Sequence, residues 1–208
     1  MTDSGRRYDR TYFDRWYRDE RLRVFTPGER ARRVAVAVAA TEYVLGRPLR
    51  NTLDIGAGEG HWRAPLLALR PRSSYEGIDP SAYAVKRFGA SRNIRLGTVE
   101  SLGGLAFRSA FDLVLAVGFL NLLEPRGVGR ALRAIRPLVR GVALLELFTS
   151  DDPLTGDIRR YHLAPRAAYG RMLVRAGFVP LGLHLYATVD SADALARLEF
   201  QVRRRRGP

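Results

Sequence analysis

Two almost unbroken apolar runs, FDLVLAV at residues 111–117 and VALLELF at residues 142–148, constrain the fold of this chain more than any other feature. A strand with one solvated face alternates apolar and polar residues, whereas a strand buried on both faces is apolar throughout. Both runs are therefore predicted to be inner strands of a parallel sheet that helices cover on both sides.

Shorter strand and helix patterns alternate around these two runs. Strands are predicted at residues 51–55, 74–78 and 94–97, and helices at residues 62–69, 81–88, 127–136 and 165–176. This alternation indicates parallel strands joined by crossover helices. Residues 179–189 and 195–202 are predicted to be two strands without a helix between them, which favours an antiparallel pair. The predicted fold class is α/β: a Rossmann-like, doubly wound, seven-stranded sheet, mostly parallel with an antiparallel edge hairpin, plus N-terminal helices.

Residues 1–46 are predicted to form an N-terminal helical lid or extension. The segment 8–22, YDRTYFDRWYRDERL, repeats its aromatic residues at helical spacing. A second helix is predicted to begin at Thr26-Pro27, because threonine is a good N-cap and proline suits a first turn, and to end near Gly46. Residues 47–202 are then the sheet domain, and residues 203–208 a basic tail.

The composition narrows the functional classes. The chain has 208 residues and no cysteine, which excludes disulfides, thiolate catalysis and cysteine zinc sites. Its three histidines lack metal-ligand spacing, so no metal site is expected. The net charge of +14 would suit a protein that binds a polyanion such as RNA. Nearly all of this charge comes from arginines scattered along the chain, which favours compositional bias over RNA binding as its origin. The polar start and the lack of a long apolar run predict a cytoplasmic protein without membrane association. The oligomeric state is left open.

Residues 52–60, TLDIGAGEG, place a glycine-rich turn directly after the first strand of the sheet. Glycines let the backbone approach a ligand, and the next helix offers free N–H groups. No G-K-S/T follows, which excludes a P-loop. The spacing G-x-G-x-G differs from the dinucleotide fingerprint, and Asp54 is predicted to face solvent, where it would repel a pyrophosphate and attract an ammonium group. A nicotinamide enzyme is therefore only a distant alternative.

The stretch DIGAGEG at residues 54–60 resembles motif I, D/E-x-G-x-G-x-G, of the class I S-adenosylmethionine-dependent methyltransferases of small molecules. Similar stretches follow in the family's order: YEGID, GTVESL, FDLVLAVGFLNLL and RAIRPLVRGVALLEL, so that the resemblance covers roughly residues 50–202. It implies S-adenosylmethionine as cofactor and S-adenosylhomocysteine as product. The asparagine–proline–proline–aromatic motif of DNA and protein amino-methylating relatives is absent, which argues against those substrates.

The resemblance also implies which residues bind the cofactor. The turn is expected to hold the methionine end, Asp79 the ribose hydroxyls, and the loop around Glu100 the adenine, while aromatic residues of the first helix cover the site. The implied cofactor-binding residues are Asp54, Gly56, Ala57, Gly58, Gly60, Asp79, Pro80, Val99, Glu100, Ser101, Val117, Gly118, Tyr12 and Trp16.

Methyl transfer from a sulfonium is an in-line displacement that needs alignment and desolvation more than a fixed catalytic group. His162 and Tyr161, in the loop after the fifth strand, are the weak candidates for catalysis, with Arg159 to orient the acceptor. Alternatively, His162 only precedes the next helix. Asn121 is assigned no chemistry, and His184 is predicted to lie in a strand with a structural role.

These residues predict a methyltransferase of a small-molecule acceptor whose methylated atom is open. Two alternatives remain: an RNA methyltransferase that uses the arginine-rich surface, and a non-catalytic binding protein that keeps the fold.

Overall fold

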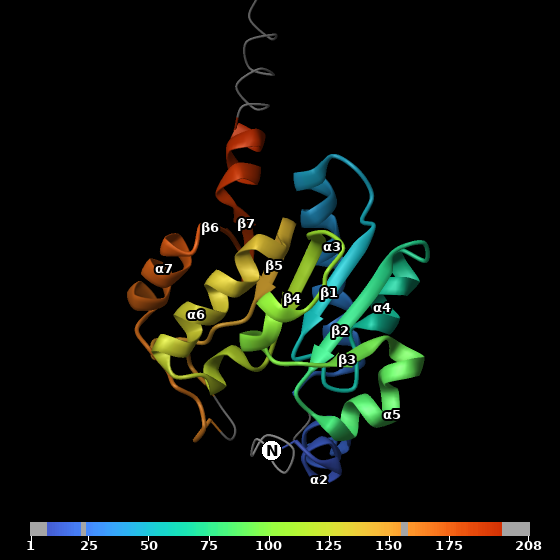
Figure 1. Ribbon diagram of the computed structural model, residues 1–208. Helices are drawn as coiled ribbons and strands as arrows, with labels where there is room; N and C mark the ends of the chain where they lie inside the picture. The colour runs from blue at the N-terminus through green and yellow to red at the C-terminus, as the bar shows by residue number, and fades with distance from the viewer. Residues whose placement is uncertain (1–7, 22–23, 155–157, 197–208) are drawn as a thin grey trace, which may run out of the picture.

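The computed structural model describes residues 8–21, 24–154 and 158–196. Seven strands form one sheet in the order β3-β2-β1-β4-β5-β7-β6, with helices over both faces (Figure 1). The strands β1 to β5 run parallel to one another, whereas β7 is antiparallel to both β5 and β6. The predicted α/β fold class is confirmed. The strands are β1 Asn51–Ile55, β2 Ser74–Asp79, β3 Ile94–Leu96, β4 Phe111–Ala116, β5 Val139–Leu145, β6 Phe178–Gly182 and β7 Leu185–Thr188.

Strand β4 shows why the apolar runs are continuous. Leu113 and Leu115 belong to the buried cluster on the face covered by α3 and α4, and Val114 and Ala116 to the cluster on the face covered by α6 and α7. Every residue of β4 is buried, as expected for a strand with helices on both sides. The α-helices between residues 10 and 175 are α2 Arg10–Phe13, α3 Pro27–Leu45, α4 Arg63–Leu69, α5 Ala82–Arg92, α6 Pro125–Ile135 and α7 Arg166–Arg175.

Helix α3 begins and ends where the sequence predicts. The Thr26 hydroxyl accepts from the Glu29 N–H at 3.2 Å, and the Glu29 carboxylate accepts from the Thr26 N–H at 2.8 Å, so that both orphan donors are satisfied. Gly46, at φ +62°, ends the helix. Because α3 buries Val34 and Val38 against the sheet, its packing favours counting it with the sheet domain. The division at residue 46 stays a prediction.

The C-terminal hairpin lies earlier than predicted. Apart from Phe178, both β6 and β7 fall within the single strand expected at residues 179–189, and Leu183 and His184 form the turn between them at φ +52° and +61°. His184 is therefore in a turn and not in a strand. Residues 189–196 are helical, so a strand at 195–202 is wrong for its two described residues. The remainder of that strand and the basic tail at 203–208 lie outside the described residues.

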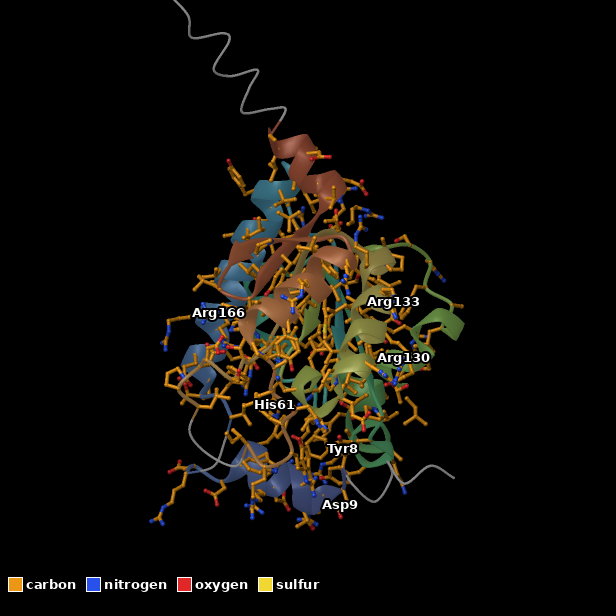
Figure 2. All side chains as sticks on the ribbon, turned by 90° about the vertical axis from the view of Figure 1, so that its left-hand side faces the viewer. Tyr8, Asp9, His61, Arg130, Arg133 and Arg166 are labelled. Carbon is orange, nitrogen blue, oxygen red and sulfur yellow. The ribbon has the colours of Figure 1, made fainter. Side chains whose placement is uncertain are left out.

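Two smaller differences concern the edges of elements. Strand β5 begins at Val139, three residues before the predicted start, and the N-terminal segment continues from α2 into a π-helical turn, Asp14–Arg18. On the outer surface, Arg130 and Arg133 of α6 and Arg166 of α7 extend away from the sheet (Figure 2). None of the helices in the described part of the chain is long and apolar enough to cross a membrane.

Candidate functional site

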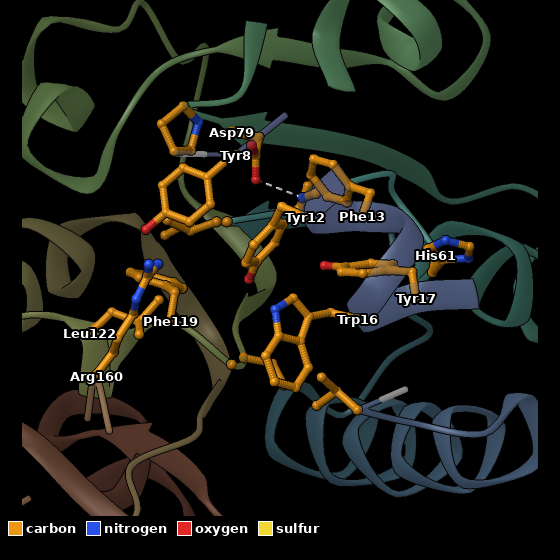
Figure 3. A pocket seen from close by; sticks show the side chains of 18 of the residues that line it. Tyr8, Tyr12, Phe13, Trp16, Tyr17, His61, Asp79, Phe119, Leu122 and Arg160 are labelled. Atoms are coloured by element: carbon orange, nitrogen blue, oxygen red, sulfur yellow. Dashed lines mark hydrogen bonds between the residues drawn. The ribbon is translucent and has the colours of Figure 1, made fainter. Parts of the chain in front are cut away.

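A cavity of about 950 Å³ lies beyond the carboxyl ends of β1, β2 and β4, where ligands bind in open α/β sheets (Figure 3). One side, here called the floor, consists of residues 55–58, 79–80, 97–100 and 117–118, all at strand ends. The opposite side, the roof, consists of lining residues from segment 8–17 and residues 159–161. The sheet therefore supplies one side of the site, and two separate segments supply the opposite side. Residues 24–25, 30, 61–62, 119 and 122–123 complete the lining.

The glycine turn of the floor needs glycine for two reasons. Gly56, Gly58 and Gly60 all have positive φ, between +54° and +71°, which other residues adopt at a cost. A Cβ on Gly56 would lie 2.7 Å from Phe119 Cδ1, and one on Gly58 would lie 2.5 Å from the Tyr17 hydroxyl. The turn is thus shaped both by its backbone and by the aromatic side chains packed against it.

Asp79 is the carboxylate of the floor. It is 6% exposed, lines the cavity, and accepts from the Gly58 N–H at 2.7 Å and the Ser81 N–H at 2.8 Å. Burial raises its pKa to about 6, and the two backbone donors oppose that effect. Since an ionised carboxylate has about four acceptor positions, Asp79 can still accept from ligand hydroxyls.

Asp54 lies elsewhere, contrary to the expectation that it faces solvent. It is 1% exposed, does not line the cavity, and accepts from the Tyr75 hydroxyl at 2.6 Å. Burial raises its pKa to about 7. The side chain therefore lies behind the glycine turn, and Tyr75, which the sequence did not single out, is its direct partner.

The other floor residues named from the sequence divide into two groups. Ala57, Pro80, Val99, Glu100, Val117 and Gly118 line the cavity together with Gly56 and Gly58. Ser101 does not, because its hydroxyl accepts from the Thr98 N–H at 2.9 Å and caps a short 3₁₀ turn. Gly60 lines only a small neighbouring pocket.

Aromatic side chains line the roof. Tyr12, Trp16 and Tyr17 all line the cavity, and Tyr8 and Tyr12 meet edge to face with ring centroids 5.1 Å apart. Burial raises the pKa of the Tyr12 and Tyr17 phenols well above the usual value, so both remain neutral donors.

Two polar contacts tie the roof to the sheet. Arg18 Nη2 donates to Glu59 Oε1 at 2.5 Å, and the Ser81 hydroxyl donates to the Tyr8 carbonyl at 2.5 Å. Glu59 is buried and also contacts His61 at 3.2 Å. Sequence reasoning missed Glu59, because it occupies a variable position between two motif glycines and its partner is distant in sequence.

The loop after β5 brings Tyr161 to the cavity but not His162. Tyr161 lines the roof beside Arg160 and stacks on Phe148, with ring centroids 6.3 Å apart. His162 is exposed, and its N–H donates to the Asn121 carbonyl at 2.8 Å. Asn121 is itself buried and bonds both backbone groups of Phe148, which is a structural role. The structure therefore does not support His162 as a base.

Arg159 also lines the cavity, as does His61. In the described part of the chain, no group of three or more histidine, cysteine or acidic side chains is arranged to hold a metal ion.

Comparisons with known proteins show which family model and which proteins this chain resembles. The family model described as "Methyltransferase domain" matches residues 53–143, from β1 into β5. The hybrid PKS-NRPS synthetase traA of Penicillium crustosum is 30% identical over 167 residues, which are 70% of this chain and 4% of that protein. The chain thus spans a small part of that curated relative.

Solved structures share the fold. The 1,6-didemethyltoxoflavin-N1-methyltransferase of Burkholderia thailandensis, with bound acceptor and S-adenosylhomocysteine, is 26% identical at a TM-score of 0.51, covering 72% of this chain and 68% of its own. The sugar N-methyltransferase KedS8 from Streptoalloteichus has a TM-score of 0.65 at 16% identity, covers 85% and 91%, and shows the fold alone.

Proposed function

We infer that this chain, which belongs to the class I S-adenosylmethionine-dependent methyltransferases, transfers a methyl group from S-adenosylmethionine to a small-molecule acceptor and leaves S-adenosylhomocysteine. The family predicted from the sequence is confirmed. The observation that carries the proposed activity is the buried carboxylate of Asp79, which lines the cavity beside the glycine turn with acceptor positions to spare.

The floor fits each part of the cofactor. Asp79 would accept from both ribose hydroxyls, and Glu100 from the adenine amine, with Val99 against the ring. We assign the methionine carboxylate to Arg30, whose half-buried guanidinium lines the cavity 5.9 Å from the Trp62 ring centre, next to the glycine turn. Asp54 would position the turn through Tyr75 without touching the ligand.

The roof fits a small acceptor. When bound, the cofactor supplies a methyl group that its sulfonium already activates. The aromatic side chains of the roof exclude water and align the acceptor, which is most of what this displacement requires. Tyr161 is half-buried, and this burial raises its pKa, so that it would orient the acceptor as a neutral hydrogen-bond donor. The 1,6-didemethyltoxoflavin bound in the Burkholderia enzyme is an example of a small-molecule acceptor.

RNA is the second acceptor class that we retain, since the net charge of +14 suits a polyanion. We place the activity in the cytoplasm as part of the same proposal, and a non-catalytic protein that only binds the cofactor is the outcome to exclude.

Titration calorimetry of the chain with S-adenosylmethionine, S-adenosylhomocysteine and, as a control, NAD tests the cofactor. We expect binding of the first two and none of NAD; failure of both to bind contradicts the proposal. Transfer of a radiolabelled methyl group to small aromatic molecules, compared with transfer to total RNA, then separates the two acceptor classes.

A further inference from the structure

The charged residues of the cavity are divided between its two sides. Three acidic residues line it, and two of them, Asp79 and Glu100, belong to the floor and serve the cofactor in the function proposed above. The third, Asp9, accepts from the Tyr12 N–H at 3.0 Å and caps α2. The roof therefore presents no lining acid, among the described residues, that is not already used within its own helix.

Arg160 is one of three arginines of the roof, together with Arg15 and Arg159. Its side chain is exposed at the cavity and extends toward the space that Tyr8, Tyr12 and Phe119 surround (Figure 3). The carboxylates within 8–21, 24–154 and 158–196 provide no ion-pair partner for it. A guanidinium that borders a cavity, with no carboxylate partner among the described residues, is suited to bind a carboxylate in two parallel hydrogen bonds.

The walls around this space are flat and apolar. Phe119 and Leu122 follow β4 and line the cavity, and Tyr161 faces the same space from the loop after β5. Aromatic faces bind a flat conjugated ring over a large area and with a preference for offset stacking. Such walls alone would also suit an ammonium group through cation–π contacts, but the positive charge of Arg160 opposes a cationic acceptor.

We propose that the acceptor is a flat, conjugated carboxylic acid, whose carboxylate is bound by Arg160 and whose ring system lies against Tyr12 and Phe119. This inference rests on the proposed methyltransferase function and narrows its substrate class. Arg160 is then the residue that determines specificity for the anion, while Arg30 serves the cofactor.

The test uses four probes of the same carbon skeleton with the full chain saturated in S-adenosylhomocysteine. They are 2-naphthoate, its neutral amide 2-naphthamide, the cation 2-naphthylmethylamine, and the saturated, non-planar decahydro-2-naphthoate. We expect 2-naphthoate to bind at least about tenfold more tightly than each of the other three, since a charge-assisted bidentate pair and a stacked ring each contribute roughly that much. Calorimetry or competition with a fluorescent naphthoate measures these affinities.

The variant Arg160→Gln should remove the preference for 2-naphthoate over 2-naphthamide, and Arg160→Lys should restore part of it. Arg130→Gln is the matched control, because Arg130 is an exposed arginine on the outer side of α6, away from the cavity (Figure 2). Affinity for S-adenosylhomocysteine should stay within about twofold in all three variants.

Four outcomes would each overturn the inference. They are equal affinity for the acid and the amide, tighter binding of the amine, no binding of 2-naphthoate at millimolar concentration, and an Arg160→Gln variant that keeps the preference for the acid. None of these outcomes decides the proposed function, which depends on binding of S-adenosylmethionine and S-adenosylhomocysteine and on transfer of the methyl group.

Discussion

The floor and the roof of the cavity are built in different ways. The floor is made of strand ends, and backbone hydrogen bonds hold it: the N–H groups of Gly56 and Ala57 both donate to the Ile78 carbonyl, at 2.9 and 3.0 Å. Its one buried carboxylate, Asp79, is held by two further backbone donors. A ligand meets groups here whose positions the sheet already determines.

The roof is made of side chains from two segments distant in sequence, and it is held to the sheet by the Arg18–Glu59 and Ser81–Tyr8 contacts. Its aromatic rings pack on one another and on Gly58. In the function proposed above, the sheet would bind the cofactor that the family shares, and the roof would recognise the acceptor of this chain. The experiments below test that division.

The largest effect is expected from Asp79→Asn. The amide cannot accept from two ribose hydroxyls as an ionised carboxylate does, so affinity for S-adenosylhomocysteine should fall by about a hundredfold or more, which is ~3 kcal/mol. Asp54→Asn is the matched control: it changes an equally buried carboxylate that does not line the cavity, and its amide oxygen can still accept from Tyr75. Calorimetry measures both. Equal losses in the two variants would show that the floor does not recognise the ribose through Asp79.

Gly56→Ala tests how Phe119 packs against the glycine turn of the floor. The alanine would have to adopt a positive φ, and its Cβ would lie 2.7 Å from Phe119 Cδ1. We therefore expect a loss of about 2–3 kcal/mol in the free energy of unfolding. Gly46→Ala has a similar φ of +62° and nothing within 4 Å of the new Cβ, so it should cost only about 1 kcal/mol. Denaturant unfolding measures the free energy of unfolding of both variants. Equal losses would mean that the Phe119 side chain moves away from the new Cβ at no cost.

The same contrast describes what the sequence could predict. Local signals placed α3 and the floor, because Thr26, Glu29 and Gly46 act within one turn of the helix and Asp79 ends an unmistakable strand. The C-terminal hairpin was misplaced because Leu183 and His184 form its turn, and neither residue type marks a turn with positive φ. Strand β5 was placed too late because it opens with Val139-Arg140-Gly141, which resembles a loop after Pro137.

The roof could be predicted only in outline. Helical spacing placed Tyr12 and Trp16 over the site, but the contact of Arg18 with Glu59 joins two segments that only the folded chain brings together. The choice between Tyr161 and His162 depended on which of two adjacent side chains faces the cavity. That orientation follows from the bond between the His162 N–H and the Asn121 carbonyl, a long-range contact that no local pattern encodes.

Acidification should act on the floor in two opposite directions. Burial raises the pKa of Asp79 to about 6, so the folded protein without cofactor binds this proton more tightly than the unfolded chain and gains stability as the pH falls through that value. The ribose hydroxyls, in contrast, need the ionised carboxylate. Affinity for S-adenosylhomocysteine should therefore be constant above about pH 7 and fall by up to about tenfold per unit below about pH 6.

Calorimetry and thermal unfolding between pH 5 and pH 8, with and without S-adenosylhomocysteine, measure both effects. Asp79→Asn should remove the pH dependence of affinity. An affinity that stays constant through pH 5 would mean that the cofactor does not depend on this carboxylate.

The smallest effect is expected from Arg18→Gln, which loosens the roof and leaves the floor intact. Arg18 is 41% exposed and its partner Glu59 is 3% exposed, so solvent screens the pair and its loss should weaken S-adenosylhomocysteine binding only about two- to fivefold. Cleavage within the N-terminal segment by a protease should become faster by a similar factor, because a roof that opens more often exposes its backbone. Arg10→Gln is the control, since Arg10 is 74% exposed and its ion-pair partner among the described residues is Asp14 of the same segment, at 3.4 Å. If both variants behave alike, the contact with Glu59 does not hold the roof to the floor, and the aromatic packing of Tyr17 on Gly58 must carry that task.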